Sequence, residues 1–317
     1  MNSRKLYGVL NRVVRLEAFV VAEVRFPQKR VFWFSMLELF LAIILPVILN
    51  IIVALNPRLF EDLPASNLTL TDCYYFSVMF IMQLQFINLV LKLYESYSSI
   101  NFVLEMLRRR GGQPYIPILD TEQMQAARGK HPLHDPAGTV RQLRKLHCTL
   151  CDLLETLNST YSIQILVCAT QHFIGITFNI YSIVVHTIGD QENVAANLAW
   201  NVTTSFWLVC DSLIILGVAS SCCITAQQAN STSSIVHKLL NEECEVRTKE
   251  ELQLFSMQLL HRRIQFTACG FFDLDYTFIH SIVGAVTTYL VILIEFQLTY
   301  GKMDTKNMAT SAPKRRN

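Results

Sequence analysis

Residues 271–298 read FFDLDYTFIHSIVGAVTTYLVILIEFQL, an apolar run that only a few polar residues interrupt. Its length exceeds the roughly 20 residues that an α-helix needs to cross a bilayer. Four earlier segments have the same character, at residues 32–55, 73–94, 161–187 and 198–226. Polar residues inside them, such as His172 and Asp211, favour helices that pack together or line a cavity over isolated anchors. The sequence therefore predicts an all-α integral membrane protein, a helical bundle with five transmembrane helices.

The composition agrees with a location in the membrane. Hydrophobic residues make up 51% of the chain and charged residues 16%, whereas soluble domains have about 25% charged residues. The sequence contains no Walker-type phosphate loop, dinucleotide glycine motif, nucleophile elbow or zinc-protease motif. We therefore expect a protein that is not an enzyme, without cofactor, metal site or nucleic-acid partner. The run His147-Cys148-x-x-Cys151 has no second pair at zinc-site spacing, which favours a packing role.

Lysine and arginine are distributed unevenly among the segments that connect the apolar runs. Segments 1–31, 96–158 and 227–269 hold seven, eight and five of these residues, whereas 56–72 holds one and 188–197 none. Because basic residues gather on the cytoplasmic side, the pattern predicts a cytoplasmic N-terminus and, after five spans, an extracellular tail at 299–317. The five basic residues of that tail argue the other way, but the three earlier segments outnumber them.

This orientation decides which glycosylation sequons can be modified. Asn67-Leu68-Thr69 falls on the predicted outer face, so Asn67 is the candidate acceptor. The sequons at Asn158 and Asn230 fall on the cytoplasmic side, and that at Asn201 lies inside a span. We expect none of these three to carry a glycan.

The predicted cytoplasmic segments 96–158 and 227–269 are too long for simple turns and too short for a catalytic domain. Apolar residues recur at three- and four-residue spacing in 140–158 and again in 235–260, which indicates helices. We expect membrane helices of the 32–298 bundle to extend into the cytoplasm, where they pack on one another or on a neighbouring subunit.

The last predicted span carries a recognisable motif. Thr288-Tyr289 is followed by five apolar residues, 290–294, and then by Glu295-Phe296. This pattern resembles the C-terminal signature of insect gustatory receptors, which is Thr-Tyr, five apolar residues and Gln-Phe. Glu295 stands where the family has glutamine. Upstream residues that also resemble the family are Leu146-His147, Leu150-Cys151, residues 266–272 and Asp275.

The resemblance implies a seven-span taste receptor of the plasma membrane that assembles as a homo- or heterotetramer. It would open a non-selective cation pore when a tastant binds, with the last helix of each subunit around the pore. The five predicted spans correspond to spans three to seven of the family, which indicates a chain truncated at its N-terminus. The alternative to a functional channel subunit is a truncated isoform without function.

One face of the last span is small and polar. At 100° per residue its members fall within an arc of about 80°; they are Ser281, Gly284, Thr288, Val291 and Glu295. Four such faces around an axis would form a pore with a narrow apolar ring at Val291 and a ring of Glu295 carboxylates, which attracts cations. The alternative is that the small residues permit close packing between helices and Glu295 bonds a neighbour.

Candidate ligand-binding residues lie in the two preceding spans; they are Gln171, His172, Trp207 and Asp211. Trp200, Trp207 and Asp211 fall within about 60° on one helix, and two indoles beside a carboxylate suit a polyhydroxylated or cationic ligand. Trp200 could instead be an interfacial belt residue, and the polar residues could simply bond between helices. Residues 285–296 resemble the branch that holds fructose-type receptors, which favours a sugar over a bitter compound.

Two other function classes fit the sequence less well. A G-protein-coupled receptor would have its C-terminus in the cytoplasm, opposite to the orientation that the basic residues predict. A transporter or membrane enzyme would need several ionisable residues at matched depth in different spans. Asp211 and Glu295 are the candidates, and they lie at different depths.

Overall fold

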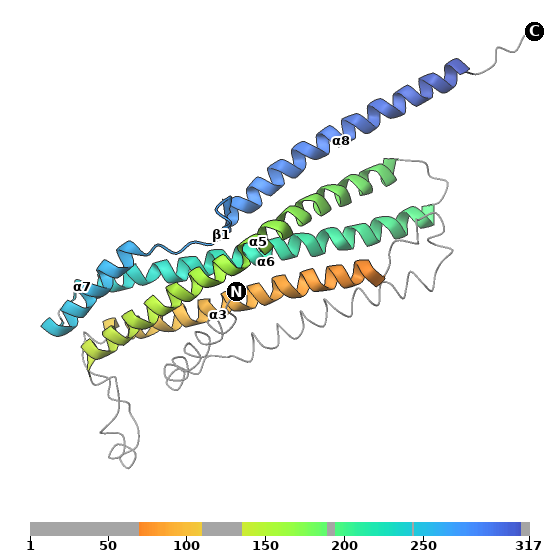
Figure 1. Cartoon of the computed structure of the whole chain (residues 1–317). Helices are drawn as coiled ribbons and strands as arrows, with labels where there is room; N and C mark the ends of the chain where they lie inside the picture. The colour runs from red at the N-terminus through yellow and green to blue at the C-terminus, as the bar shows by residue number, and fades with distance from the viewer. Residues whose placement is uncertain (1–69, 110–134, 189–193, 243, 312–317) are drawn as a thin grey trace, which may run out of the picture. The chain divides into compact units, whose positions relative to one another are not determined.

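The computed structural model describes residues 70–109, 135–188, 194–242 and 244–311 (Figure 1). The helices of this part are α3 (Leu70–Arg109), α5 (Pro136–Ile188), α6 (Val194–Leu240), α7 (Val246–His261) and α8 (Tyr276–Ser311). Strands β1 (Thr267–Ala268) and β2 (Phe272–Asp273) form an antiparallel hairpin between α7 and α8. The predicted span at 32–55, the segment 1–31 and the sequon at Asn67 lie outside the described residues.

Four of the described helices, α3, α5, α6 and α8, are long and apolar enough to cross a membrane. They correspond to four of the five predicted spans. Helix α5 has 53 residues and α6 has 47. At 1.5 Å per residue such helices are more than twice as long as the roughly 30 Å hydrocarbon core of a bilayer. Both helices therefore continue well beyond their apolar segments.

The last helix begins at Tyr276, so the prediction that it starts at Phe271 is wrong. Cys269 and Gly270 have φ values of +52° and +74°, and this left-handed pair reverses the chain. Ala268 then pairs with Phe272 across the hairpin. At its other end α8 continues past the predicted limit of the span at Leu298 to Ser311.

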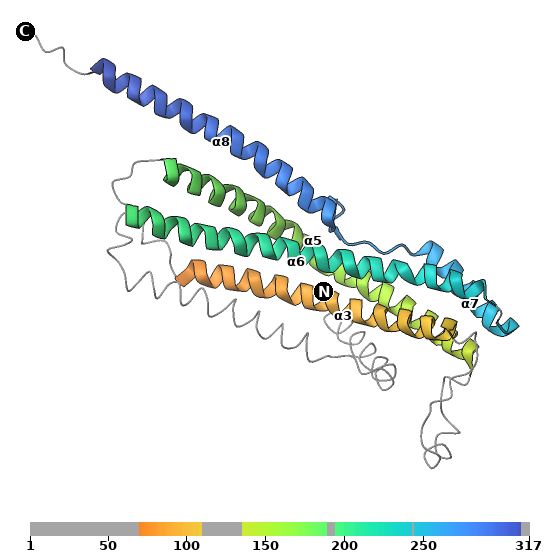
Figure 2. The ribbon, with the colours of Figure 1, turned by 180° about the vertical axis from the view of Figure 1, so that it is seen from behind.

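The chain divides into two compact units, and the long helices α3, α5 and α6, which Figure 2 shows from behind, each contribute to both. Among the described residues, unit 1 contains α3 from Leu84, α5 up to Ile163, and residues 220–274, which include α7 and the hairpin. Unit 2 contains α3 up to Gln83, residues 164–219 and α8.

The core of unit 1 joins α3, α5, α6 and α7. Its largest fully buried side chains include Tyr97 and Phe255, whose rings lie edge-on against the imidazole of His147 at centroid distances of 5.3 and 5.6 Å. The Nδ1 atom of His147 lies 3.5 Å from the Sγ atom of Cys151. His147 and Cys151 are therefore part of the packed core.

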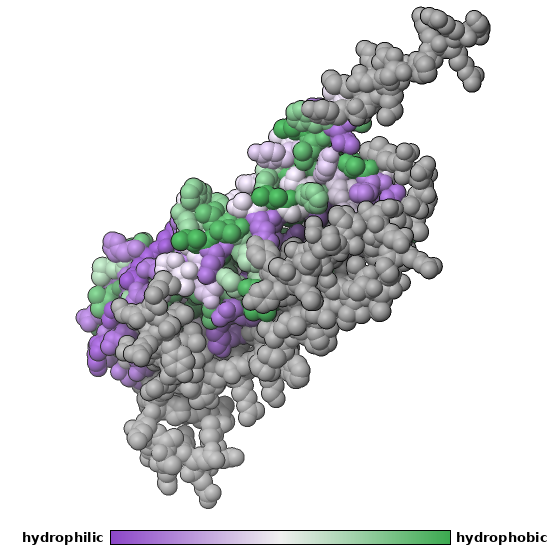
Figure 3. Space-filling view, turned by 45° about the vertical axis from the view of Figure 1, so that its right-hand side comes forward, coloured by the Kyte–Doolittle hydropathy of each residue, from purple (hydrophilic) through white to green (hydrophobic). Residues whose placement is uncertain are grey.

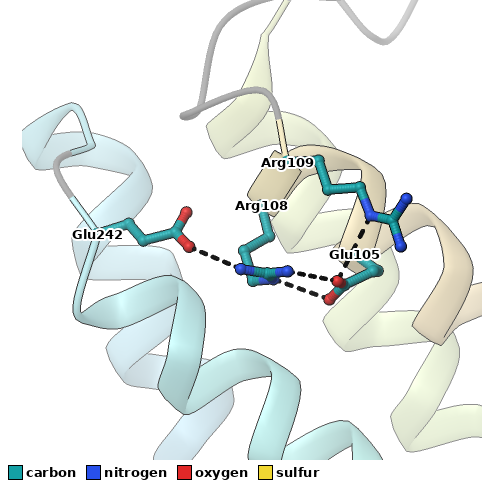
Figure 4. A network of polar contacts seen from close by, with 4 residues as sticks. All are labelled: Glu105, Arg108, Arg109 and Glu242. Carbon is teal, nitrogen blue, oxygen red and sulfur yellow. Dashed lines mark hydrogen bonds and ion pairs between the residues drawn. The ribbon is translucent and has the colours of Figure 1, made fainter.

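Charged side chains join the helix ends of unit 1. Arg108 of α3 bonds Glu105 on its own helix at 2.6 Å and Glu242, just after α6, at 3.2 Å (Figure 4). Arg141 and Arg144 of α5 lie 2.6 and 3.4 Å from the two carboxylate oxygens of Glu251 on α7. The pairs of Arg108 are partly exposed and each contributes little energy, whereas Glu251 is buried beside its two arginines; both sets join helix ends.

Candidate functional site

Within unit 2, helix α8 packs on α5 and α6 through one narrow stripe. Val286 is buried with Ile176 of α5 and Ile215 of α6 in a small apolar core. The α8 side chains around this core come at three- and four-residue spacing; they are Phe278, Ile279, Ile282 and Leu290. Such spacing keeps them on one side of the helix.

The predicted pore-lining residues lie on the opposite side of α8. At 100° per residue, Ser281, Gly284, Thr288, Val291 and Glu295 fall within about 40° of the direction opposite Val286. All five are exposed, and a Cβ atom built on Gly284 would meet nothing within 4 Å. A space-filling view shows hydrophobic side chains exposed along α8 as well (Figure 3). Most of α8 between residues 276 and 299 is thus available for contacts outside the described part of the chain.

The hydroxyl groups of this face bond within α8 itself. Ser281 Oγ donates to the Thr277 carbonyl and Thr288 Oγ1 to the Gly284 carbonyl, both at 2.9 Å. The motif residues Tyr289 and Phe296 are 54% and 59% exposed. Tyr289 nevertheless touches Phe173 of α5 edge-on, at a centroid distance of 5.8 Å.

The start of α8 is fixed by an acidic cap. Asp275 Oδ1 accepts hydrogen bonds from the backbone N–H of Thr277 at 2.8 Å and of Phe278 at 3.4 Å. An aspartate in this position satisfies N–H groups that have no partner inside the helix, and its charge favours the positive end of the helix dipole. Asp275, one of the residues in which the sequence resembles the gustatory family, therefore caps the first turn of α8.

A buried polar cluster joins three helices of unit 2. Nδ1 of His172, on α5, lies 2.9 Å from Asp211 Oδ1 on α6, and its Nε2 lies 3.0 Å from Gln83 Oε1 on α3. These three side chains belong to residues that are only 6–7% exposed. Gly175, one turn after His172, faces the second carboxylate oxygen, because a Cβ atom there would lie 3.1 Å from Asp211 Oδ2.

The cluster accounts for polar side chains in an otherwise apolar interior. An unpaired carboxylate would be costly there, and the imidazole supplies a hydrogen-bond partner. Both ring nitrogens of His172 have a partner, so its ring is held in one orientation. The arrangement links α3, α5 and α6, with Asp211 Oδ2 facing Gly175 of α5.

Two of the four predicted ligand-binding residues are thus hydrogen-bonded to each other. Gln171 and Trp207 are half-buried, and the Trp207 indole packs against the neighbouring Phe206 ring at 5.6 Å. Trp200 donates from Nε1 to Ser182 Oγ of α5 at 2.8 Å, so it links two helices. Sequence reasoning did not assign Gln83 to the site. In the sequence, Gln83 is notable only as a polar residue in the middle of an apolar span.

Comparison with known proteins identifies the family. The family model described as 7tm Chemosensory receptor matches residues 1–300. The chain belongs to this receptor family. Gustatory receptor 28b of Drosophila melanogaster is 32% identical over 164 residues, which are 51% of this chain and 35% of that receptor. Gustatory receptor 28a of the same species is 30% identical over 181 residues, 56% of this chain and 40% of that receptor.

A solved structure supports the same fold. The insect olfactory receptor OR5 from Machilis hrabei, determined in complex with eugenol, aligns over 92% of this chain and 70% of its own, with a TM-score of 0.50 and 12% identity. The matches to the two Drosophila receptors span less than half of those receptors. This 7tm chemosensory receptor chain is a multi-pass membrane protein of a receptor family, not of an enzyme family.

Proposed function

We propose that this chain is a subunit of a tastant-gated, non-selective cation channel whose pore is lined by α8. The observation that carries the proposal is the direction of the small polar face of α8, opposite the stripe that packs on α5 and α6. Glu295 would be costly against lipid, where an ionisable side chain needs water or a partner. Bringing the α8 helices of several subunits together gives this face an aqueous interior.

In a symmetric tetramer three residues of this face would have distinct roles. Four Thr288 hydroxyls would line the pore, and four Val291 side chains would form its apolar constriction. Four Glu295 carboxylates would form a ring that concentrates cations. Where the gustatory family has glutamine, this subunit would place a charge, and we expect it to bind divalent cations more strongly.

The basic residues support an orientation in the plasma membrane. Connections rich in lysine and arginine favour a cytoplasmic N-terminus and an extracellular C-terminus. The Glu295 end of α8 would then lie near the outer mouth of the pore, where it meets entering cations first.

The polar cluster of unit 2 supports a nearby site for a small-molecule tastant. The Asp211 carboxylate lies on α6 against Gly175 of α5, and the half-buried Gln171 and Trp207, an amide and an indole, belong to the same two helices. These features suit a polyhydroxylated ligand, so we propose a sugar in preference to a bitter compound. OR5, which has the same fold, was solved with the small molecule eugenol.

Calcium block of tastant-evoked current tests the pore assignment. We expect Glu295→Gln to weaken block by external calcium several-fold, because the carboxylate ring becomes neutral. The matched control is Ile294→Val, a change at the adjacent, half-buried position that leaves the ring charge intact. Whole-cell currents are measured with sugars and with bitter alkaloids as stimuli. Equal calcium block in Glu295→Gln and Ile294→Val would contradict the pore assignment.

A further inference from the structure

The connector between α7 and α8, residues 262–274, is held by side chains of other helices. It contains the β1–β2 hairpin and leads from His261, the last residue of α7, to the cap of α8 at Asp275 (Figure 1). All of the connector belongs to unit 1. Because its backbone is not helical, its N–H and C=O groups need partners from elsewhere.

Asn230 of α6 supplies two of these partners at one residue. Its Nδ2 atom donates to the Ile264 carbonyl at 3.0 Å, and its Oδ1 atom accepts from the Ile264 N–H at 3.2 Å. The side-chain amide thereby pairs with both backbone groups of Ile264, as a neighbouring strand would. This contact fixes the first half of the connector on α6.

Asn158 and Ser162 of α5 hold the hairpin one turn apart. Asn158 Oδ1 accepts from the Thr267 N–H at 3.1 Å. Ser162 Oγ accepts from the Cys269 N–H at 2.5 Å and donates to the Thr267 carbonyl at 3.4 Å. These bonds hold the strand β1 and the left-handed residue that follows it.

Apolar side chains hold the same segment from within. Alternate residues of the connector are buried, with Ile264 7%, Phe266 2% and Ala268 0% exposed, and so is Leu274 at 2%. The Phe266 ring meets that of Phe86 of α3 edge-on at 6.4 Å. The connector is thus fastened by both main chain and side chains, from three helices.

The hydrogen bonds of Asn158, Ser162 and Asn230 to the connector, which we call the clamp, also account for two sequons. Asn158 and Asn230 each begin an Asn-Ser-Thr sequence. In the folded chain the Asn230 amide nitrogen, the atom that would carry a glycan, donates to the Ile264 carbonyl. Thr232 of the same sequon donates from Oγ1 to Asn101 Oδ1 at 2.7 Å. The side chains of Asn230 and Thr232 are therefore both occupied in hydrogen bonds to other parts of the chain.

We propose that Asn158, Ser162 and Asn230 are positioning residues that set the gating equilibrium of the channel by fixing the connector from which α8 begins. The proposal rests on the proposed function of α8 as the pore helix. Asp275 caps α8 immediately after Leu274, the last residue of the connector. A connector that is free to move would therefore let the first turn of α8 move with it.

The structural half of the proposal is tested by amide hydrogen exchange on the purified full chain. Asn158→Leu removes the acceptor for Thr267, whereas Asn158→Asp keeps it and is the matched control. We expect exchange in the segment around Thr267 and Cys269 to rise roughly fivefold or more in Asn158→Leu and to stay near wild type in Asn158→Asp, as loss of a hydrogen bond of average strength implies. Equal exchange in all three proteins would overturn the clamp.

The functional half is tested by the current as a function of tastant concentration, at matched surface expression. We expect Asn158→Leu and Asn230→Leu to shift the half-activating concentration several-fold, and Asn158→Asp to restore the wild-type value. Raised exchange with unchanged activation would overturn the coupling to gating. If the wild-type chain carries no current, the proposed function fails, while the exchange measurement still decides whether the clamp exists.

Discussion

The carboxylate of Asp211 lies inside the apolar part of the bundle, where each of its two oxygens contacts a different residue of α5. Oδ1 is taken by His172 at 2.9 Å, and Oδ2 lies against α5 where Gly175 has no side chain. The glycine matters because any Cβ atom would come within 3.1 Å of that oxygen, closer than an ordinary contact. Gly175, whose side chain is a single hydrogen atom, therefore allows α5 and α6 to approach each other here.

Two glycines of the membrane helices give a matched pair of substitutions. Gly175→Ala is expected to lower the melting temperature in detergent by several degrees, because the new methyl group pushes Asp211 away from its position. Gly284→Ala is expected to leave the melting temperature unchanged or raise it, since alanine favours a helix and nothing lies within 4 Å. A larger loss in Gly284→Ala than in Gly175→Ala would contradict the packing described for Asp211.

At the scale of single elements, α7 is attached to α5 through a charge contact. Glu251 of α7 accepts from Arg141, and this hydrogen bond holds the pKa of the carboxyl group below its ordinary value of 4.5. A lowered pKa means that the contact stabilises the folded chain above the unfolded pKa and that this contribution is lost as the pH falls through the folded pKa.

Acidification below about pH 4.5 is therefore expected to weaken the docking of α7. Glu251→Gln removes the titrating group, so its stability should change less over this pH range than that of the wild type. Thermal unfolding in detergent, measured from pH 7 down to about pH 3 so that the range extends below the unfolded pKa, compares the two proteins. A wild type and a Glu251→Gln variant with the same pH profile would show that the contact contributes nothing.

The helices and the two faces of α8 could be predicted from the sequence, because apolar length and 3.6-residue periodicity are local properties. The hairpin could not, because Phe271 and Phe272 read as the continuation of an apolar run. The role of Gln83 was also hidden, since the partner of a buried amide depends on how α3 is rotated against α5. The sequence predicts only that Asn158 and Asn230 begin unmodified cytoplasmic sequons, and the folded connector shows their partners.

At the scale of the whole molecule, the chain is a 7tm chemosensory receptor whose last helix is attached to the rest of unit 2 by a narrow stripe. The remainder of α8 combines apolar and small polar residues on a free surface. Oligomeric assembly around α8 would cover that surface. The proposed function is therefore tested on the assembled protein and not on the single chain.

The accessibility of α8 residues to a charged thiol reagent tests the pore assignment most directly. Thr288 and Val291 lie on the exposed face of α8, and Ile282 packs against the apolar core of α5 and α6; each is replaced in turn by cysteine. A water-soluble methanethiosulfonate cation is applied during tastant-evoked current, with the wild type as the control for native cysteines. We expect irreversible loss of current in Thr288→Cys and Val291→Cys and none in Ile282→Cys. Modification of Ile282→Cys alone, with the two free-face variants unaffected, would contradict it.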